Sequence, residues 1–196
     1  MTPTPQIILA STSAHRRQLL ERLRLPFSAL APQVDEAEMA GEAPATRAAR
    51  LALAKARAVA AMHPGAIVIG SDQVASLRIG TEMVLLHKPG DRTHAHAQLA
   101  DMAGRTVRFD TGVAVIRDAV ELAHVDLTAV QVRPLTHLEI GRYIDREPAF
   151  DCAGGFKCEG LGVSLFESVE TRDPTALVGL PLIWLCAALR RLGVVV

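Results

Sequence analysis

One acidic residue, Asp72, follows a stretch that is typical of a buried strand. Ala66–Ile69 is a run of apolar residues without alternation, which predicts a strand buried on both faces of an α/β sheet. Gly70 and Ser71 would then let the chain leave the sheet. In open α/β sheets, ligands bind beyond the carboxyl ends of strands, so Asp72 is a candidate general base or metal ligand. The alternative is that Asp72 caps the next turn, a common role of Asp.

A second candidate site is a hydroxyl-rich turn near the N-terminus. Gln6–Ala10 predicts a buried first strand, and Ser11, Thr12 and Ser13 precede a helical pattern over Ala14–Leu23, where Ser or Thr is a typical N-cap. Arg16 and Arg17 fall in the first helical turn, where cations oppose the helix dipole. An anion at the turn would explain them, because backbone N–H groups and two guanidiniums would converge on it. The alternative is two solvated arginines on a surface helix.

Two lysines complete the set of cationic candidates. Lys55 falls inside a predicted Ala-rich helix, Ala45–Met62, and its alanine neighbours leave room for close approach. Lys88 lies in a loop that continues with Pro89 and Gly90. A lone lysine on a helix is usually a solvated charge, so the local pattern leaves the role of Lys55 open.

The segment Phe150–Gly162 holds four glycines among thirteen residues and contains Glu159. Such a density of glycine permits unusual backbone angles and lets a ligand approach the main chain closely. A glycine-rich loop alone does not specify which ligand that is.

The rest of the chain predicts the strands and helices that must position these residues. The predicted strands are Phe27–Ala31, the hairpin Val74–Gly80 with Glu82–Leu86, and the antiparallel pair Arg105–Arg117 and Ala119–Val132. The predicted helices are Thr93–Met102, capped by Thr93, the capped helix Thr136–Asp145, and the closing helix Leu182–Leu192. In the second of these helices we expect Leu138, Ile140 and Ile144 in the core. No repeat or linker interrupts the pattern, so we expect residues 1–196 to form a single domain.

The bulk composition narrows the class of protein. Lys plus Arg and Asp plus Glu both total 21, so the formal net charge of zero argues against a strongly basic nucleic-acid surface. Three cysteines without paired Cys-x-x-Cys spacing indicate neither a disulfide framework nor a zinc site. Met1–Gln6 has no signal-peptide pattern, and the apolar stretch Ala176–Leu189 is too short to span a bilayer. We therefore expect a soluble cytoplasmic protein with neither nucleic-acid nor membrane partners.

Taken together, these motifs resemble the Maf family of nucleoside triphosphate pyrophosphatases. The likeness covers almost the whole chain and keeps the order of the family's motifs. The matching segments are Leu9–Ser13 with Arg16 and Arg17, Val34–Glu36, Ala54–Ala56, Gly70–Gln73, Lys88–Pro89, Phe150–Phe156, Glu159–Gly162 and Val178–Pro181. Each motif is short, but eight in one order are hard to obtain by chance.

This resemblance implies both a fold and a reaction. The fold is an elongated, inosine-triphosphatase-like α/β fold, a mixed twisted sheet flanked by helices with a central cleft, usually in a homodimer. The reaction cuts a nucleoside triphosphate between the α and β phosphates, giving the nucleoside monophosphate and pyrophosphate, with a divalent metal cation as cofactor.

The resemblance also implies a role for each candidate residue. Asp72 would be the general base that activates water, and Glu36 would help Asp72 bind Mg²⁺ or Mn²⁺. The triphosphate would be held by Ser11, Arg16, Arg17, Lys55 and Lys88. These residue types suit the reaction, because phosphoryl transfer needs positioning and neutralisation of charge more than covalent help.

Within the family, two residues indicate which base is accepted. Gln73 after Asp72 resembles the branch that acts on 7-methyl-GTP, whereas the dTTP/UTP branch typically has Thr there. Glu159 stands where that other branch has Gln. A carboxylate can accept hydrogen bonds from the N1–H and N2–H₂ edge of guanine and offsets the charge of an N7-methylated ring. Against thymine or uracil it would place repelling oxygens.

His15 is a departure from the 7-methyl-GTP branch, which usually has Trp or Tyr before the arginine pair. An aromatic ring there would stack on the cationic base. A neutral histidine stacks more weakly, so His15 is a third candidate for base specificity.

Two other functions stay open at this point. The first alternative to a 7-methyl-GTP pyrophosphatase is a dTTP/UTP-specific member of the family. The second is a non-catalytic nucleotide-binding regulator, since some relatives are linked to septum formation and arrest of cell division. Asp72 together with Lys55 and Lys88 favours an enzyme, because a pure binder needs no carboxylate that activates water.

Overall fold

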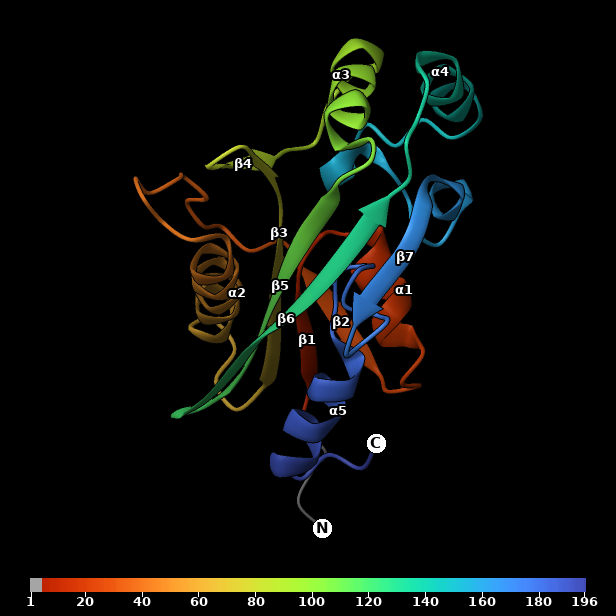
Figure 1. Cartoon of the computed structure of the whole chain (residues 1–196). Coiled ribbons are helices and arrows are strands. Elements are labelled where there is room, and N and C mark those ends of the chain that lie inside the picture. Colours follow the sequence, from red (N-terminus) through yellow and green to blue (C-terminus); the bar gives the residue numbers. More distant parts are fainter. Residues whose placement is uncertain (1–4) are drawn as a thin grey trace. The chain divides into compact units, whose positions relative to one another are not determined.

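The computed structural model describes residues 5–196, and these form two compact units (Figure 1). Residues 1–4 lie outside the described residues, so part of Met1–Gln6, the segment without a signal-peptide pattern, is not described. Unit 1 comprises residues 5–73, 111–126 and 173–196, and unit 2 comprises residues 74–110 and 127–172. Three long strands contribute residues to both units: β3 (Ile67–Ile79), β5 (Thr106–Arg117) and β6 (Val120–Val132).

The strands of unit 1 begin with a parallel set, as the apolar runs predict. β1 (Ile7–Ala10) pairs in parallel with β2 (Phe27–Leu30) on one side and with the first residues of β3 on the other. The register with β3 runs from Ile7 opposite Ile67 to Ala10 opposite Gly70. Every residue of β1 is buried, because helices cover both faces of this part of the sheet.

The two faces of β1 and β3 pack against different helices. Ile7, Leu9, Ile67 and Ile69 pack with the leucines of α1 (Ala14–Glu21) and α5 (Leu182–Arg191). The alternate residues of both strands pack against α2, which spans Pro44–Ala60 and begins with the proline that fits its first turn. The expected helix–sheet–helix layering around these strands is confirmed.

Unit 2 contains the hairpin that the sequence predicts. β4 (Glu82–Leu86) pairs antiparallel with the end of β3, with Ala75 opposite Leu86. β7 (Phe166–Thr171), which the sequence pattern did not reveal, pairs antiparallel with β6, with Val130 opposite Val169. Overall the strands pair in the order β2-β1-β3-β5-β6-β7, with β4 on β3, so the sheet is mixed and the α/β class is confirmed.

Two helices of unit 2, α3 (Arg92–Met102) and α4 (His137–Arg146), lie side by side (Figure 1). Thr136 caps α4 in a full capping box with Glu139, as its sequence predicts. The predicted cap of α3 is wrong, because Asp91 rather than Thr93 accepts the hydrogen bond from His94 N. Two short 3₁₀ helices, Ala153–Gly155 and Leu161–Leu165, follow α4.

Two further expectations need correction. The chain does not leave the sheet at Gly70 and Ser71, because β3 continues through Asp72 to Ile79. Asp72 therefore lies in the middle of a strand and caps no turn. Leu138 is not a core residue: it is 63% exposed, since the buried face of α4 is formed by Ile140, Tyr143 and Ile144.

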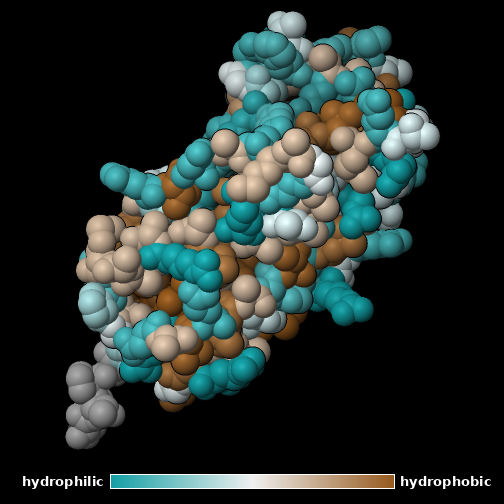
Figure 2. Space-filling model, turned by 90° about the vertical axis from the view of Figure 1, so that its left-hand side faces the viewer, coloured by the Kyte–Doolittle hydropathy of each residue, from teal (hydrophilic) through white to brown (hydrophobic). Residues whose placement is uncertain are grey.

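The surface is mixed in polarity. In the face that Figure 2 shows, hydrophobic residues are interspersed with hydrophilic ones, the usual appearance of a globular surface. Within residues 5–196, none of the helices has the length and apolar character needed to cross a membrane.

Candidate active site

A buried ion pair between α2 and β3 is the centre of the polar cluster in unit 1. Lys55 Nζ lies 2.6 Å from Asp72 Oδ1 and 2.8 Å from Glu36 Oε1. Lys55 is 6% exposed and Asp72 8% exposed, whereas Glu36 lies on an exposed loop after β2. A buried charge is costly without a partner, so the ammonium and the carboxylates stabilise one another. The reading of Lys55 as a solvated surface charge is therefore wrong.

Glycines in two strands bring Lys55 close to Asp72. A Cβ atom on Gly70 would lie 2.2 Å from the carbonyl oxygen of Ala52, and one on Gly112 would lie 2.2 Å from that of Ala48. The backbone of α2 thus rests directly on β3 and β5. Glycine within a strand often marks such a close approach, and here it lets Lys55 reach the carboxylate two residues beyond Gly70.

Arg16 is the second cation of the cluster. Its Nε donates to the carbonyl oxygen of Gly179 at 3.0 Å, and the side chain is partly buried. Burial lowers the pKa of the Arg16 guanidinium, while Asp72 and Glu36 oppose that change through their charges. A guanidinium keeps its proton across the physiological range, so Arg16 is a fixed positive charge in the field of both carboxylates.

Arg17 is placed differently from its neighbour. Adjacent residues on a helix do not face the same direction, and Arg17 is exposed where Arg16 turns inward. That both guanidiniums contact one anion stays a prediction. His15 lies in the same first turn of α1 and is partly buried.

The hydroxyl-rich turn before α1 forms the predicted N-cap. Ser13 Oγ accepts a hydrogen bond from Arg16 N at 3.4 Å, and Ser11 Oγ accepts one from Ser13 N at 3.1 Å. Ser11 is buried. These two hydrogen bonds therefore fix the conformation of the turn directly before the first residues of α1.

The carbonyl oxygen of Gly179 joins the loop before α5 to the site. Besides the guanidinium of Arg16, the hydroxyl of Ser71 reaches it at 2.9 Å, and the same hydroxyl lies 2.7 Å from the carbonyl oxygen of Gly112. Gly179 has φ of 121°, a conformation that favours glycine. Ser71 is fully buried, so this hydroxyl fixes the backbone beside Asp72.

Gln73 contacts the same loop. Its Nε2 lies 3.0 Å from each of three oxygens: Thr111 Oγ1, Ala176 O and Leu177 O. An amide nitrogen carries two N–H donors, and both are directed at protein atoms here. Gln73 thus fixes the loop in this conformation, and its role in choosing the base stays a prediction.

Asp173 is a residue of the site region that the sequence interpretation missed. It is 2% exposed, and its two oxygens accept hydrogen bonds from Thr175 N, Thr175 Oγ1 and Ile183 N at 2.9, 2.6 and 2.7 Å. These bonds tie together the two ends of the loop that contains Gly179. The available signal was the Asp-x-Thr spacing, which is typical of an Asx turn.

The two remaining candidates, Lys88 and Glu159, belong to unit 2 and are both exposed. Their segments are neighbours within that unit. Gly90 N donates to Phe150 O at 3.0 Å, and a Cβ atom on Gly155 would lie 3.6 Å from Pro89 Cγ. The loop of Lys88 therefore packs against the glycine-rich segment that carries Glu159.

The cysteines near Glu159 do not have the character of reactive thiolates. Burial raises the pKa of the Cys158 thiol to about 12 and that of Cys152 to about 11. Cys158 Sγ lies 3.4 Å from Glu159 Oε2, close enough to donate a weak hydrogen bond. Because nucleophilic cysteines need a lowered pKa, both thiols stay protonated at neutral pH.

These features describe an α/β protein with a buried carboxylate–lysine pair and an arginine at a helix N-terminus, a class of site suited to an anionic ligand. The family model described as "Maf-like protein" matches residues 6–192, and the chain belongs to the Maf family. The resemblance inferred from the motifs is confirmed.

Curated relatives cover nearly the full chain. One from Xanthomonas oryzae pv. oryzae (strain MAFF 311018), named 7-methyl-GTP pyrophosphatase, is 59% identical over 96% of this chain and 97% of its own. One from Bordetella avium (strain 197N) has the same name and is 50% identical over 98% of this chain and 96% of its own. A solved Ham1 protein from Coxiella burnetii aligns with 66% of this chain and 73% of its own, at 16% identity and a TM-score of 0.45.

Proposed function

We propose that this protein is a nucleoside triphosphate pyrophosphatase that hydrolyses 7-methyl-GTP to the monophosphate and pyrophosphate. The observation that carries the chemistry is the contact of Lys55 Nζ with Asp72 and Glu36. Relatives that share 50–59% of their residues over nearly the whole chain bear the name of this activity. The removal of a non-standard nucleotide would make this a house-cleaning enzyme.

Asp72 is the proposed general base. Lys55 bonds Oδ1 of this carboxylate, and we assign Oδ2 to the attacking water. The water oxygen forms a bond to one phosphorus of the α–β bridge, the bridging P–O bond breaks, and the proton of the water passes to Asp72. Lys55 fixes the orientation of the carboxylate while this transfer takes place.

The cations proposed to bind the triphosphate are Arg16, Arg17, Lys55 and Lys88. Arg16 is held in place by Gly179, and Arg17 and Lys88 are exposed and available to solvent ligands. Ser11 would contribute to the turn before α1. Charge-assisted hydrogen bonds of this kind are about twice as strong as neutral ones, and they act on the charges that phosphoryl transfer must neutralise.

Glu36 and Asp72 are the residues that we propose to hold a divalent metal cation. Both supply carboxylate oxygens and they lie close together, since each contacts Lys55 Nζ, at 2.8 and 2.6 Å. Oxygen ligands are those that Mg²⁺ and Mn²⁺ prefer, and we propose one of these ions as the cofactor. When bound, the metal would neutralise phosphate charge.

For base specificity we propose three residues, Glu159, Gln73 and His15. Glu159 is exposed, and its negative charge suits the N7-methylated ring. We also propose that the protein acts in the cytoplasm as a homodimer, in line with its family.

The test is release of pyrophosphate in the presence of Mg²⁺ from 7-methyl-GTP, GTP, dTTP and UTP in competition. We expect 7-methyl-GTP to have the highest kcat/KM, whereas a clear preference for dTTP would assign the protein to the pyrimidine branch. Absence of turnover with all four, alongside retained binding, would favour a non-catalytic regulator.

A further inference from the structure

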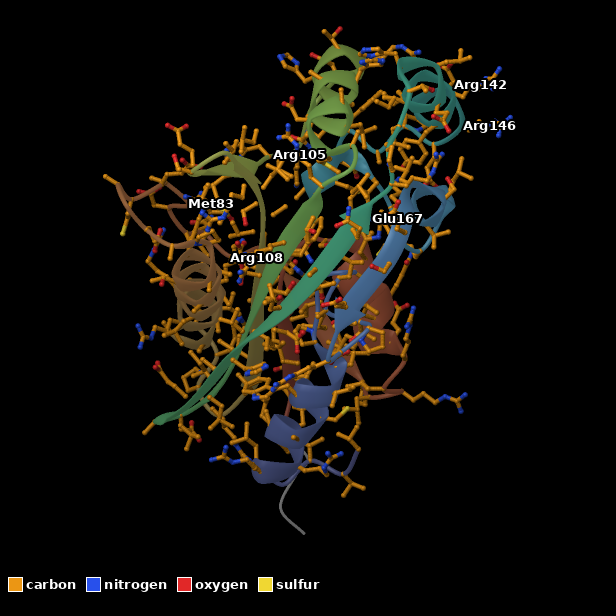
Figure 3. All side chains as sticks on the ribbon, in the orientation of Figure 1. Met83, Arg105, Arg108, Arg142, Arg146 and Glu167 are labelled. Atoms are coloured by element: carbon orange, nitrogen blue, oxygen red, sulfur yellow. The ribbon has the colours of Figure 1, made fainter. Side chains whose placement is uncertain are left out.

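The end of α4 presents two kinds of side chain. Arg142 and Arg146 point away from the molecule (Figure 3), and both are exposed. Tyr143, on the same helix, is buried, and Glu147 is the residue that ends the helix and is partly buried. The second pair faces the segment Lys157–Gly162, which carries Glu159.

Tyr143 and Glu147 hold this segment at both ends. Glu147 Oε2 accepts a hydrogen bond from Gly162 N at 3.1 Å, and Tyr143 OH lies 3.4 Å from the same oxygen. The phenol oxygen also accepts a bond from Lys157 N at 3.4 Å. Burial raises the pKa of Tyr143, so the phenol keeps the proton that it donates to Glu147.

The Glu147 carboxylate packs directly on Gly160, and the backbone of the segment packs tightly at Gly162. A Cβ atom on Gly160 would lie 2.2 Å from Glu147 Oε1, and one on Gly162 would lie 2.3 Å from Lys157 O. The segment is also closed on itself, because Gly160 N donates to Lys157 O, and Gly162 N shares its single proton between Lys157 O and Glu147 Oε2. The turn from Lys157 to Gly160 encloses Cys158 and Glu159.

We propose that Tyr143 and Glu147 are positioning residues that fix Lys157–Gly162 and thereby set the direction in which Glu159 meets the base. This inference rests on the proposed function. Neither residue touches the nucleotide in this account. Their effect on catalysis is therefore on which base is accepted, and not on the bond cleavage itself.

The test compares three variants with one control. Glu147→Ala removes the acceptor, Tyr143→Phe removes only the bridging hydroxyl, and Glu147→Gln keeps one oxygen that can accept from Gly162 N. Arg142→Ala is the control on the outer face of the same helix. The readout is the ratio of kcat/KM for 7-methyl-GTP to that for dTTP, with kcat and KM determined separately.

We expect Glu147→Ala to lower this ratio about tenfold or more, the range for a lost hydrogen bond to a charged group, mainly through a higher KM for 7-methyl-GTP. Tyr143→Phe should lower it less, and Glu147→Gln and Arg142→Ala should stay within about threefold of wild type. An equal loss of activity on both nucleotides, which a merely structural role would produce, overturns the proposal, and so does an unchanged ratio.

A second readout separates this inference from the proposed function. Should the wild-type protein show no preference for 7-methyl-GTP, the proposed specificity fails, and amide hydrogen exchange of residues 157–162 in the nucleotide-free protein decides the positioning role. Faster exchange in Glu147→Ala and Tyr143→Phe, but not in Arg142→Ala, supports it. Equal exchange in the wild type and in these three variants overturns it.

Discussion

The residues proposed for bond cleavage and those proposed for base selection are held in opposite ways. In unit 1, Asp72 comes from the middle of β3 and Lys55 from the middle of α2, and both are buried. In unit 2, Lys88 and Glu159 are exposed and lie on loops. Glycine contacts, backbone hydrogen bonds and the side chains of Tyr143 and Glu147 hold those loops.

This difference indicates a division of labour. A general base must be held to within a fraction of an ångström, and regular elements give that precision. Loops on a rigid scaffold tolerate change and commonly carry selectivity. We therefore expect substitutions in the α2–β3 contact to affect stability and all substrates together, and substitutions in the unit 2 segment to change mainly the choice of substrate.

The largest effect on stability is expected from Lys55→Met. It leaves the Asp72 carboxylate buried without its ammonium partner, and removal of one member of a buried pair costs about 3–5 kcal/mol. Urea unfolding measures the change in free energy. The control is Arg57→Met on the same helix as Lys55, which removes an exposed pair with Glu121 of β6 and should change little. Equal effects of the two variants would contradict a special role for the buried pair.

Gly70→Ala comes next. The new methyl group would meet the carbonyl oxygen of Ala52 at 2.2 Å, so α2 must move away from β3. Overpacking of this kind costs about 1–3 kcal/mol, and the shift should also lower kcat on every nucleotide because Lys55 moves with the helix. A variant with full activity and unchanged thermal midpoint would show that the close approach does not position Lys55.

Gly141→Ala provides the contrast in unit 2. A Cβ atom at Gly141 would have only Arg92 within 4 Å, at 3.9 Å, and the residue lies inside α4. Replacing an unstrained helical glycine by alanine stabilises a helix by about 0.5–1 kcal/mol. We expect a higher midpoint of urea unfolding with unchanged substrate preference, and a destabilised protein would refute the helix geometry.

The smallest effect is expected from pH at the start of α4. Hydrogen bonds from Thr136 N, Arg133 and the Thr136 hydroxyl lower the pKa of Glu139 from 4.5 to about 2. The folded protein therefore binds this proton less readily than the unfolded chain, so the stabilisation is fully present above pH 4.5 and is lost as pH falls towards 2. The thermal midpoint of the wild type should fall more between pH 5 and 2 than that of Glu139→Gln, and parallel curves would contradict this.

Much of the fold was predictable because the signals are local. The apolar runs of β1 and the first half of β3, the Ser13 cap and the Thr136 capping box each depend on a few neighbouring residues. β7 was missed because its side chains are mostly exposed and show no clear alternation. The end of β3 was misplaced, because the glycine at position 70 marks the contact with α2 and not a departure from the sheet.

The candidate site was predictable in its charged residues and not in its supporting bonds. The order of motifs indicated Asp72, Lys55 and Glu36, and their contacts are now seen. The carbonyl oxygen of Gly179 joins Arg16 and Ser71 across more than one hundred residues of sequence, a contact that no local pattern reveals. Tyr143 and Glu147 were missed for the same reason, because they contact residues 14 and 15 positions away.

The most direct test of the comparison measures kcat and KM on 7-methyl-GTP, GTP and dTTP for Asp72→Asn and Glu159→Gln side by side. Asp101→Asn, an exposed aspartate on α3, is the control for the first change. Asp72→Asn should lower kcat on all three nucleotides by about 10²–10⁴, the contribution of a general base, while Glu159→Gln should change the ratio of kcat/KM values and leave kcat on dTTP nearly intact. Near-wild-type turnover by Asp72→Asn would contradict the account.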